Sequence, residues 1–138
     1  RLVRVTTRVG RHPKAHATAA GKVLLADLDN DRFLEIYPEE HLETLTPRTR
    51  TDRAQLCDEL SQVRAEGYAR NLGESEADMY TIAVPLHRPD GRVICALAIS
   101  TPHSRAGVRA DRALSPTEQS YLESLRNARS LIESRLGF

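Results

Sequence analysis

Two cysteines and five histidines are among the side chains of this 138-residue chain whose chemistry could support catalysis or metal binding. No two histidines are spaced i, i+4, the spacing that places two metal ligands on one helical face. Cys57 falls beside the apolar face of a predicted helix and Cys95 within a predicted strand, where a free thiol is usually a small core residue. Catalysis by one of these thiols with His16 or His87 is therefore disfavoured. We expect no enzyme, metal or cofactor.

The dipeptide Gly21-Lys22 raises a second chemical possibility, because Gly-Lys closes the phosphate-binding P-loop. That loop needs a glycine six residues before the lysine and a serine or threonine after it. Here His16 and Val23 occupy those positions. The sequence therefore predicts no P-loop.

The stretch from Ala15 to Ala26 is predicted to be a helix whose first turns carry small side chains. Glycine costs roughly 1 kcal/mol relative to alanine inside a helix, so Gly21 indicates a close backbone approach. The first amides of a helix lack intrahelical partners and carry partial positive charge. A small carboxylate could dock on them near Thr18, and tight packing on a sheet is the alternative. Both interpretations can hold together.

Two apolar runs around Pro-Asp-Gly predict a β-hairpin from Tyr80 to Thr101. The second run, Val93 to Ser100, is almost continuously apolar, so we expect a central strand covered on both faces. One of its faces narrows from Ile94 to two alanines and ends in a hydroxyl. That face suits the wall of a cavity, and close packing of a helix over the alanines is the alternative.

Other segments predict elements around this hairpin. Leu2 to Val9 reads as a strand, 33–37 as a helix capped by Asp29 or Asn30, and 68–72 as a short strand. Residues 51–66 form an amphipathic helix with a predicted capping box of Asp52 and Gln55, ended by Gly67. Between the short strand and the hairpin, the loop 73–78 carries three carboxylates that we expect to be solvated, with a lid over a pocket as the alternative.

The last helix is predicted from a strong start signal, Ser115-Pro116-Thr117-Glu118, which combines an N-cap, a proline and a capping box. Its expected buried stripe consists of Leu122, Leu125, Ala128, Ile132 and Leu136. Hairpin pairing makes the sheet mostly antiparallel, so the predicted class is α+β, with helices covering the sheet.

Composition limits the partners. Twenty basic and nineteen acidic residues leave no excess of positive charge that would bind nucleic acid. No apolar run is long enough for a membrane span, and two cysteines without metal-type spacing favour a reduced, cytoplasmic protein. The chain starts within a predicted strand and without Met, so we expect an upstream segment.

A family resemblance is carried by residues 15–26, which read Ala-His-Ala-Thr-Ala-Ala-Gly-Lys-Val-Leu-Leu-Ala. They resemble the His-Ala-Thr-Ala-x-Gly-Lys-Ala-Leu-Leu-Ala signature of IclR-type bacterial transcriptional regulators. Further matches follow in order at 45–52, 56–60, 64–69, 82–86, 90–93 and 96–100. The resemblance covers nearly the whole chain.

The resemblance implies a C-terminal effector-binding domain at residues 1–138, with a GAF-like (profilin-like) fold that is N-terminally truncated. The DNA-binding winged helix-turn-helix is expected to be absent from this chain. Such domains bind a small organic or aromatic carboxylate, form dimers or tetramers, and contact DNA only through the N-terminal domain. The alternatives are an oligomerisation module with a vestigial pocket and, less favoured, a Cys/His enzyme.

The resemblance also implies a ligand-binding site. In related domains the pocket residues fall, in this chain, at Leu2, Val5, Pro13, Ala19, Ala20, Asn71, Met79, Thr81, Ala98 and Ser100, and Thr18 is added by the helix argument. Asn71 departs from the family's frequent acidic residue and would repel an anion less. Ala98 stands where a serine can occur, which removes one polar contact.

Overall fold

A computed structural model describes residues 14–136, so the predicted strand Leu2–Val9 and the predicted site residues Leu2, Val5 and Pro13 lie outside the described residues. The described elements are α1 (Ala19–Ala26), α2 (Asn30–Ile36), α3 (Arg53–Glu66), β1 (Ala69–Leu72), β2 (Met79–His87), β3 (Val93–Pro102) and α4 (Pro116–Arg135), with 3-10 turns at Ala15–Ala17 and His103–Arg105. The α+β class predicted from the sequence is confirmed.

The described sheet is antiparallel and has the order β1-β2-β3. Gly91, at φ 87°, makes the turn between β2 and β3, so the predicted hairpin is confirmed. Within residues 14–136, β3 lies at the edge of the sheet, and Ile94 is 41% exposed. The predicted strand Leu2–Val9 lies outside the described residues, so the central place of Val93–Ser100 stays a prediction. A continuous apolar run does not by itself reveal how many neighbours a strand has.

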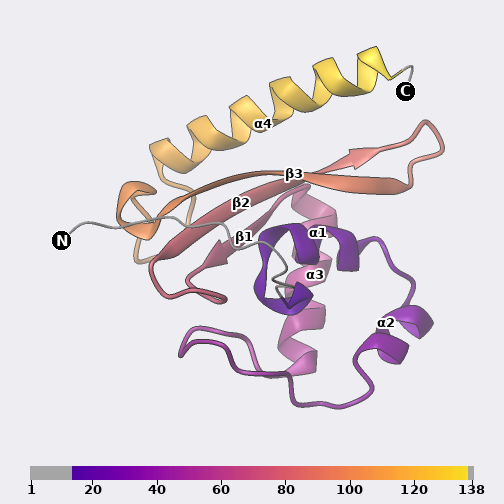
Figure 1. The fold of residues 1–138 in the computed structure, drawn as a ribbon, viewed down its shortest axis with the longest axis vertical. Coiled ribbons are helices and arrows are strands. Elements are labelled where there is room, and N and C mark those ends of the chain that lie inside the picture. The colour runs from indigo at the N-terminus through magenta and orange to yellow at the C-terminus, as the bar shows by residue number, and fades with distance from the viewer. Residues whose placement is uncertain (1–13, 137–138) are drawn as a thin grey trace, which may run out of the picture.

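The helices cover both faces of the sheet (Figure 1). α1 and α3 lie on one face, where a core cluster includes Val23, Leu56, Leu60 and Ala83. α4 lies on the other face, where a second cluster includes Tyr80, Ile82, Val84, Leu122 and Leu125. Alternate residues of β2 therefore belong to different cores, as the pleat of a strand requires.

The helix ends are fixed by local chemistry. Asp52 caps α3 by accepting a hydrogen bond from the Ala54 amide at 2.8 Å, and Gly67 ends α3 at φ 79°. The predicted capping box of Ser115 and Glu118 is present at the start of α4.

The buried stripe of α4 is shorter than predicted. Leu136 is 57% exposed, and the buried cluster beneath α4 has no member from this helix beyond Leu125.

The helix predicted over Ala15–Ala26 is divided at Thr18, which is extended at φ −125° and ψ 147°. The turn before Thr18 folds back onto α1, and Gly21 permits the approach. A Cβ added at Gly21 would lie 2.3 Å from the Ala15 carbonyl oxygen and 2.6 Å from Thr18 Oγ1. The predicted close approach at Gly21 is confirmed. Within the described residues, no helix is long and apolar enough to cross a membrane.

We expect Gly21→Ala to lower the free energy of unfolding by about 3 kcal/mol, because the added methyl group meets backbone that cannot move aside. Gly67→Ala is the matched control, since a Cβ at Gly67 would meet nothing within 4 Å. Its left-handed backbone should cost only about 1 kcal/mol. Urea unfolding of both variants measures the difference, and equal losses would refute the close approach at Gly21.

Candidate functional site

A row of polar side chains crosses the three strands on the face that carries α1. Asn71 pairs with Thr81, and Thr81 pairs with Ser100. Directly paired residues project to the same side of a sheet. The Thr81 and Ser100 hydroxyl oxygens lie 2.9 Å apart. This polar row therefore presents two linked hydroxyls and an amide from three different strands.

Small and flexible apolar residues flank the polar row on the same face. Met79 lies two residues before Thr81 and is half-buried, and Ala98 lies two residues before Ser100 and is exposed. α1 packs over β2 and β3 on this side (Figure 1). The fold thus brings α1 and the predicted strand residues to one face of the sheet.

The start of α1 supplies the predicted helix residues. Thr18 Oγ1 accepts a hydrogen bond from the Gly21 amide at 3.1 Å, so its hydroxyl hydrogen remains available to a further acceptor. The first intrahelical hydrogen bond of α1 runs from the Lys22 amide to the Thr18 carbonyl at 3.0 Å. The Ala19 and Ala20 amides come before this bond in the chain, so α1 itself offers them no acceptor. The Ala19 side chain is fully buried, and that of Ala20 is half-buried.

Only 3% of the surface of Asn71 is exposed, which is less than expected for a residue that lines an open ligand pocket. Its Oδ1 accepts from the Glu74 amide at 2.7 Å, and its Nδ2 donates to Ser75 Oγ at 2.8 Å. Asn71 therefore holds the turn that follows β1. One of its two Nδ2 hydrogens remains for another acceptor.

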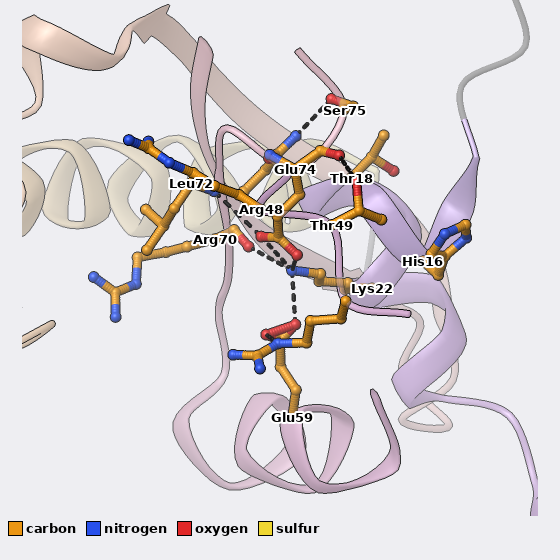
Figure 2. A network of polar contacts seen from close by, with 12 residues as sticks. His16, Thr18, Lys22, Arg48, Thr49, Glu59, Arg70, Leu72, Glu74 and Ser75 are labelled. Carbon is orange, nitrogen blue, oxygen red and sulfur yellow. Dashed lines mark hydrogen bonds and ion pairs between the residues drawn. The ribbon is translucent and has the colours of Figure 1, made fainter. Parts of the chain in front are cut away.

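Sequence reasoning missed a fully buried charge, the ammonium group of Lys22, which is 0% exposed. Figure 2 shows it pointing from α1 to Glu74 and Glu59. The Nζ atom lies 2.7 and 2.8 Å from the two Glu74 oxygens, 2.9 Å from the Arg70 carbonyl and 2.6 Å from Glu59 Oε1. An ammonium has three hydrogens, so the Glu59 contact is an ion pair beside three hydrogen bonds.

The expectation that Glu74 is solvated is wrong, because Glu74 is only 4% exposed. Lys22 neutralises its carboxylate. The Thr46 and Thr49 hydroxyls each donate at 2.6 Å to the loop, to the Gly73 and Glu74 carbonyls. The loop from β1 to β2 is thereby fixed against α1. The sequence signal for this cluster was a lone lysine within the small and apolar residues of 15–26.

The Lys22–Glu74 pair also closes the outer edge of β1. The Arg70 carbonyl accepts from Lys22, and the Leu72 amide donates to Glu74 Oε2 at 3.2 Å. These are the groups that a further strand would bind. A side-chain ion pair therefore occupies the place of a neighbouring strand.

A second buried cluster lies on the α4 side. Glu118 is 0% exposed, and its Oε2 lies 2.9 Å from Arg70 Nη1 and 2.7 Å from the Tyr80 hydroxyl. Burial and the hydrogen bond to Glu118 raise the pKa of Tyr80 well above its ordinary 10. Arg70 thus joins the two clusters through its carbonyl on one side and its guanidinium on the other. Within 14–136, no three His, Cys, Asp or Glu side chains are grouped to hold a metal ion.

We expect Lys22→Met to lower the free energy of unfolding by about 3–5 kcal/mol, because Glu74 would stay buried without its cation and Glu59 would keep only Arg50. Lys14→Met is the control, since Lys14 and Glu43 pair at 3.3 Å with side chains more than half exposed. That loss should be below about 1 kcal/mol. Denaturant unfolding measures both, and similar losses would show that the burial of Lys22 has no energetic weight.

The pH dependence of stability tests Glu59. Burial alone would raise the pKa of its carboxyl, but Lys22 and Arg50 together outweigh burial and hold the pKa below the ordinary 4.5. The ionised form is thus favoured in the folded state, and its contribution is present above pH 4.5 and is lost as the pH falls through the lowered pKa.

We therefore expect Glu59→Gln to flatten the fall of unfolding free energy as the pH drops below 4.5. Asp58→Asn, at the exposed neighbouring position on α3, serves as the control and should retain the wild-type slope. An unchanged slope in Glu59→Gln would contradict the assignment.

Comparison with known proteins places the chain in a family. The family profile described as "Bacterial transcriptional regulator IclR C-terminal" matches residues 1–132. KdgR of Escherichia coli (strain K12), an HTH-type transcriptional regulator, is 35% identical over 136 residues, which cover 99% of this chain and 49% of KdgR. The chain spans about half the length of curated relatives such as KdgR.

Two solved structures show the same fold. A regulator from Rhodococcus sp. RHA1 superposes with a TM-score of 0.84 at 32% identity, covering 99% of this chain and 53% of that one. The inducer binding domain of the PobR transcription factor from Acinetobacter, in complex with 3-hydroxybenzoic acid, superposes with a TM-score of 0.77 at 31% identity, covering 95% and 73%. The relatives are transcriptional regulators and not enzymes. The chain accordingly belongs to the IclR family of bacterial transcriptional regulators and corresponds to its C-terminal domain.

Proposed function

We propose that this domain senses a small organic or aromatic acid, which binds between the start of α1 and the polar row of β1, β2 and β3. The observation that carries the proposal is the register that aligns Asn71, Thr81 and Ser100 on the face covered by α1. Three strands and one helix each contribute to this face. A ligand bound there would contact elements that lie far apart in the sequence.

The chemistry of the row fits a carboxylate. One hydrogen bond between the Thr81 and Ser100 hydroxyls uses one of their two hydrogens, so the other can be donated to a ligand oxygen. The Thr18 hydroxyl and the first amides of α1 add donors and partial positive charge. Met79, Ala98 and Ala19 would supply apolar contacts. Leu2, Val5 and Pro13, which the family resemblance also implies, lie outside the described residues.

Family membership supports the sensing role. The related PobR domain is an inducer binding domain in complex with 3-hydroxybenzoic acid. We propose that the ligand of this chain likewise shifts an equilibrium between two arrangements of a dimer or tetramer, because it binds one arrangement more tightly. A winged helix-turn-helix upstream of this domain would then report the shift as a change in operator affinity.

Thermal unfolding in the presence of small acids tests the proposal. Suitable ligands are glyoxylate, pyruvate, protocatechuate, 3- and 4-hydroxybenzoate and phenylacetate. A ligand present at about 100 times its dissociation constant should add about 2.7 kcal/mol to the free energy of unfolding, which corresponds to several degrees. If no member of this panel shifts the midpoint, an oligomerisation module becomes the better interpretation.

Variants of the polar row locate the site. Thr81→Val and Ser100→Ala each remove one hydroxyl and should weaken the active acid about tenfold, the effect of a lost hydrogen bond to a charged group. Thr101→Val is the matched control, because Thr101 pairs with Tyr80 and lies on the α4 face. Equal weakening by all three variants would place the ligand elsewhere.

A further inference from the structure

A groove with several arginines follows the outer side of β1, away from the polar row. It consists of two adjoining hollows of about 420 and 330 Å³, which share Arg50, Leu72 and Arg112 in their walls. The smaller hollow, which we call the arginine hollow, also contains Arg48 and His103. Its walls come from the loop before α3, from β1 and from the loop before α4.

Carboxylates neutralise only part of the positive charge around the arginine hollow. Glu74 lies in its wall but is bonded to Lys22, and Glu59 is shared by Lys22 and Arg50, whose Nε lies 2.9 Å from Glu59 Oε2. Among residues 14–136, neither Arg48 nor Arg112 has a carboxylate within ion-pair distance. Two guanidinium groups therefore remain without a counter-charge in one hollow.

The backbone of Arg112 adopts a conformation that normally favours glycine. Its φ is 62°, and Arg112 is the only non-glycine residue with positive φ in the described chain. The Arg70 guanidinium holds it there by donating to the Arg112 carbonyl at 2.7 Å. Such strain persists where surrounding structure enforces it and is enriched at ligand sites. The guanidinium of Arg112 is therefore a candidate ligand-binding group.

Arg48 is held by a pre-organised loop. Its amide donates to Thr46 Oγ1 at 3.1 Å, and its Nη1 lies 3.4 Å from His103 Nε2. A Cβ added at Gly73 would come within 3.2 Å of Arg48 Nη1, so the guanidinium lies directly against that glycine. Figure 2 shows Arg48 beside the loop that Glu74 anchors.

An extended peptide is a poor occupant, because Lys22 and Glu74 already use the outer hydrogen-bonding groups of β1 at Arg70 and Leu72. Recognition must therefore come from side chains. Guanidinium groups bind carboxylate and phosphate oxygens in a bidentate manner. We propose that the arginine hollow is a second anion site, for a small polyanion that carries phosphate or at least two carboxylate groups and contacts Arg48 and Arg112.

Titration of the 138-residue chain at constant ionic strength tests this site, with pyrophosphate and citrate as probes and acetate as the monoanion comparator. We expect millimolar or tighter binding of at least one polyanion and much weaker binding of acetate. The tighter of the two probes would identify a phosphate or a polycarboxylate as the natural ligand class. Equal binding of acetate, or binding of none, would overturn the proposal.

Arg48→Gln and Arg112→Gln should each weaken polyanion binding about tenfold. Arg88→Gln, an exposed arginine next to the hairpin turn, is the matched control and should have no effect. Amide resonances of Gly73 and Arg112 should shift with the polyanion, whereas those of Thr81 and Ser100 should not. Shifts confined to the polar row, or an unchanged affinity in both variants, would refute the second site.

Arg112→Gly separates binding from folding. Glycine adopts positive φ without steric cost, so this variant should unfold at the same or a higher temperature than the wild type. Its affinity for the polyanion should nevertheless fall about tenfold, because the guanidinium is gone. Retained affinity in this stable variant would contradict the proposal. Thr81→Val should keep full polyanion affinity, which distinguishes failure here from failure of the effector site.

Discussion

The described fold depends on the ammonium group of Lys22, a full charge that has been removed from water. Such a group is tolerated only if oxygen atoms surround it, because an isolated buried charge costs many kcal/mol. Four oxygens from α3, from β1 and from the loop after β1 lie within 2.9 Å of Nζ. Each of these segments is therefore constrained to a narrow range of positions relative to α1.

This constraint reaches both proposed sites. The start of α1, with Thr18, lies one helical turn before Lys22, so the helix end and the sheet below it are held at a fixed separation. Glu74 anchors the loop against which Arg48 lies. Arg70 extends the same frame to the opposite face, where Glu118 binds its guanidinium and the Tyr80 hydroxyl. Helices on both faces of the sheet are thus connected through one strand residue.

Features that depend on neighbours in the sequence could be predicted. The Ser115 capping box, the glycine that ends α3 and the hairpin turn at Gly91 each involve residues within a few positions of one another. The family signature and the α+β class were also accessible from the sequence. The close approach at Gly21 could be inferred because glycine is costly in a helix without a steric reason.

Features that depend on distant partners could not be predicted. Lys22 and Glu74 are 52 positions apart, and nothing near Glu74 distinguishes it from a solvated acid. The polar row requires the register of three strands, which places Asn71 opposite Thr81 only after the sheet has formed. The place of β3 at the edge of the described sheet likewise follows from pairing and not from its apolar composition.

The occupied outer edge of β1 has a consequence for colloidal behaviour. An uncovered strand edge is a template for intermolecular sheet growth, and proteins usually protect such edges with short strands, charges or covering loops. Here one helix-borne cation and one loop carboxylate protect the edge from within the core. Solubility at high concentration would consequently be governed in part by two side chains that are almost entirely buried.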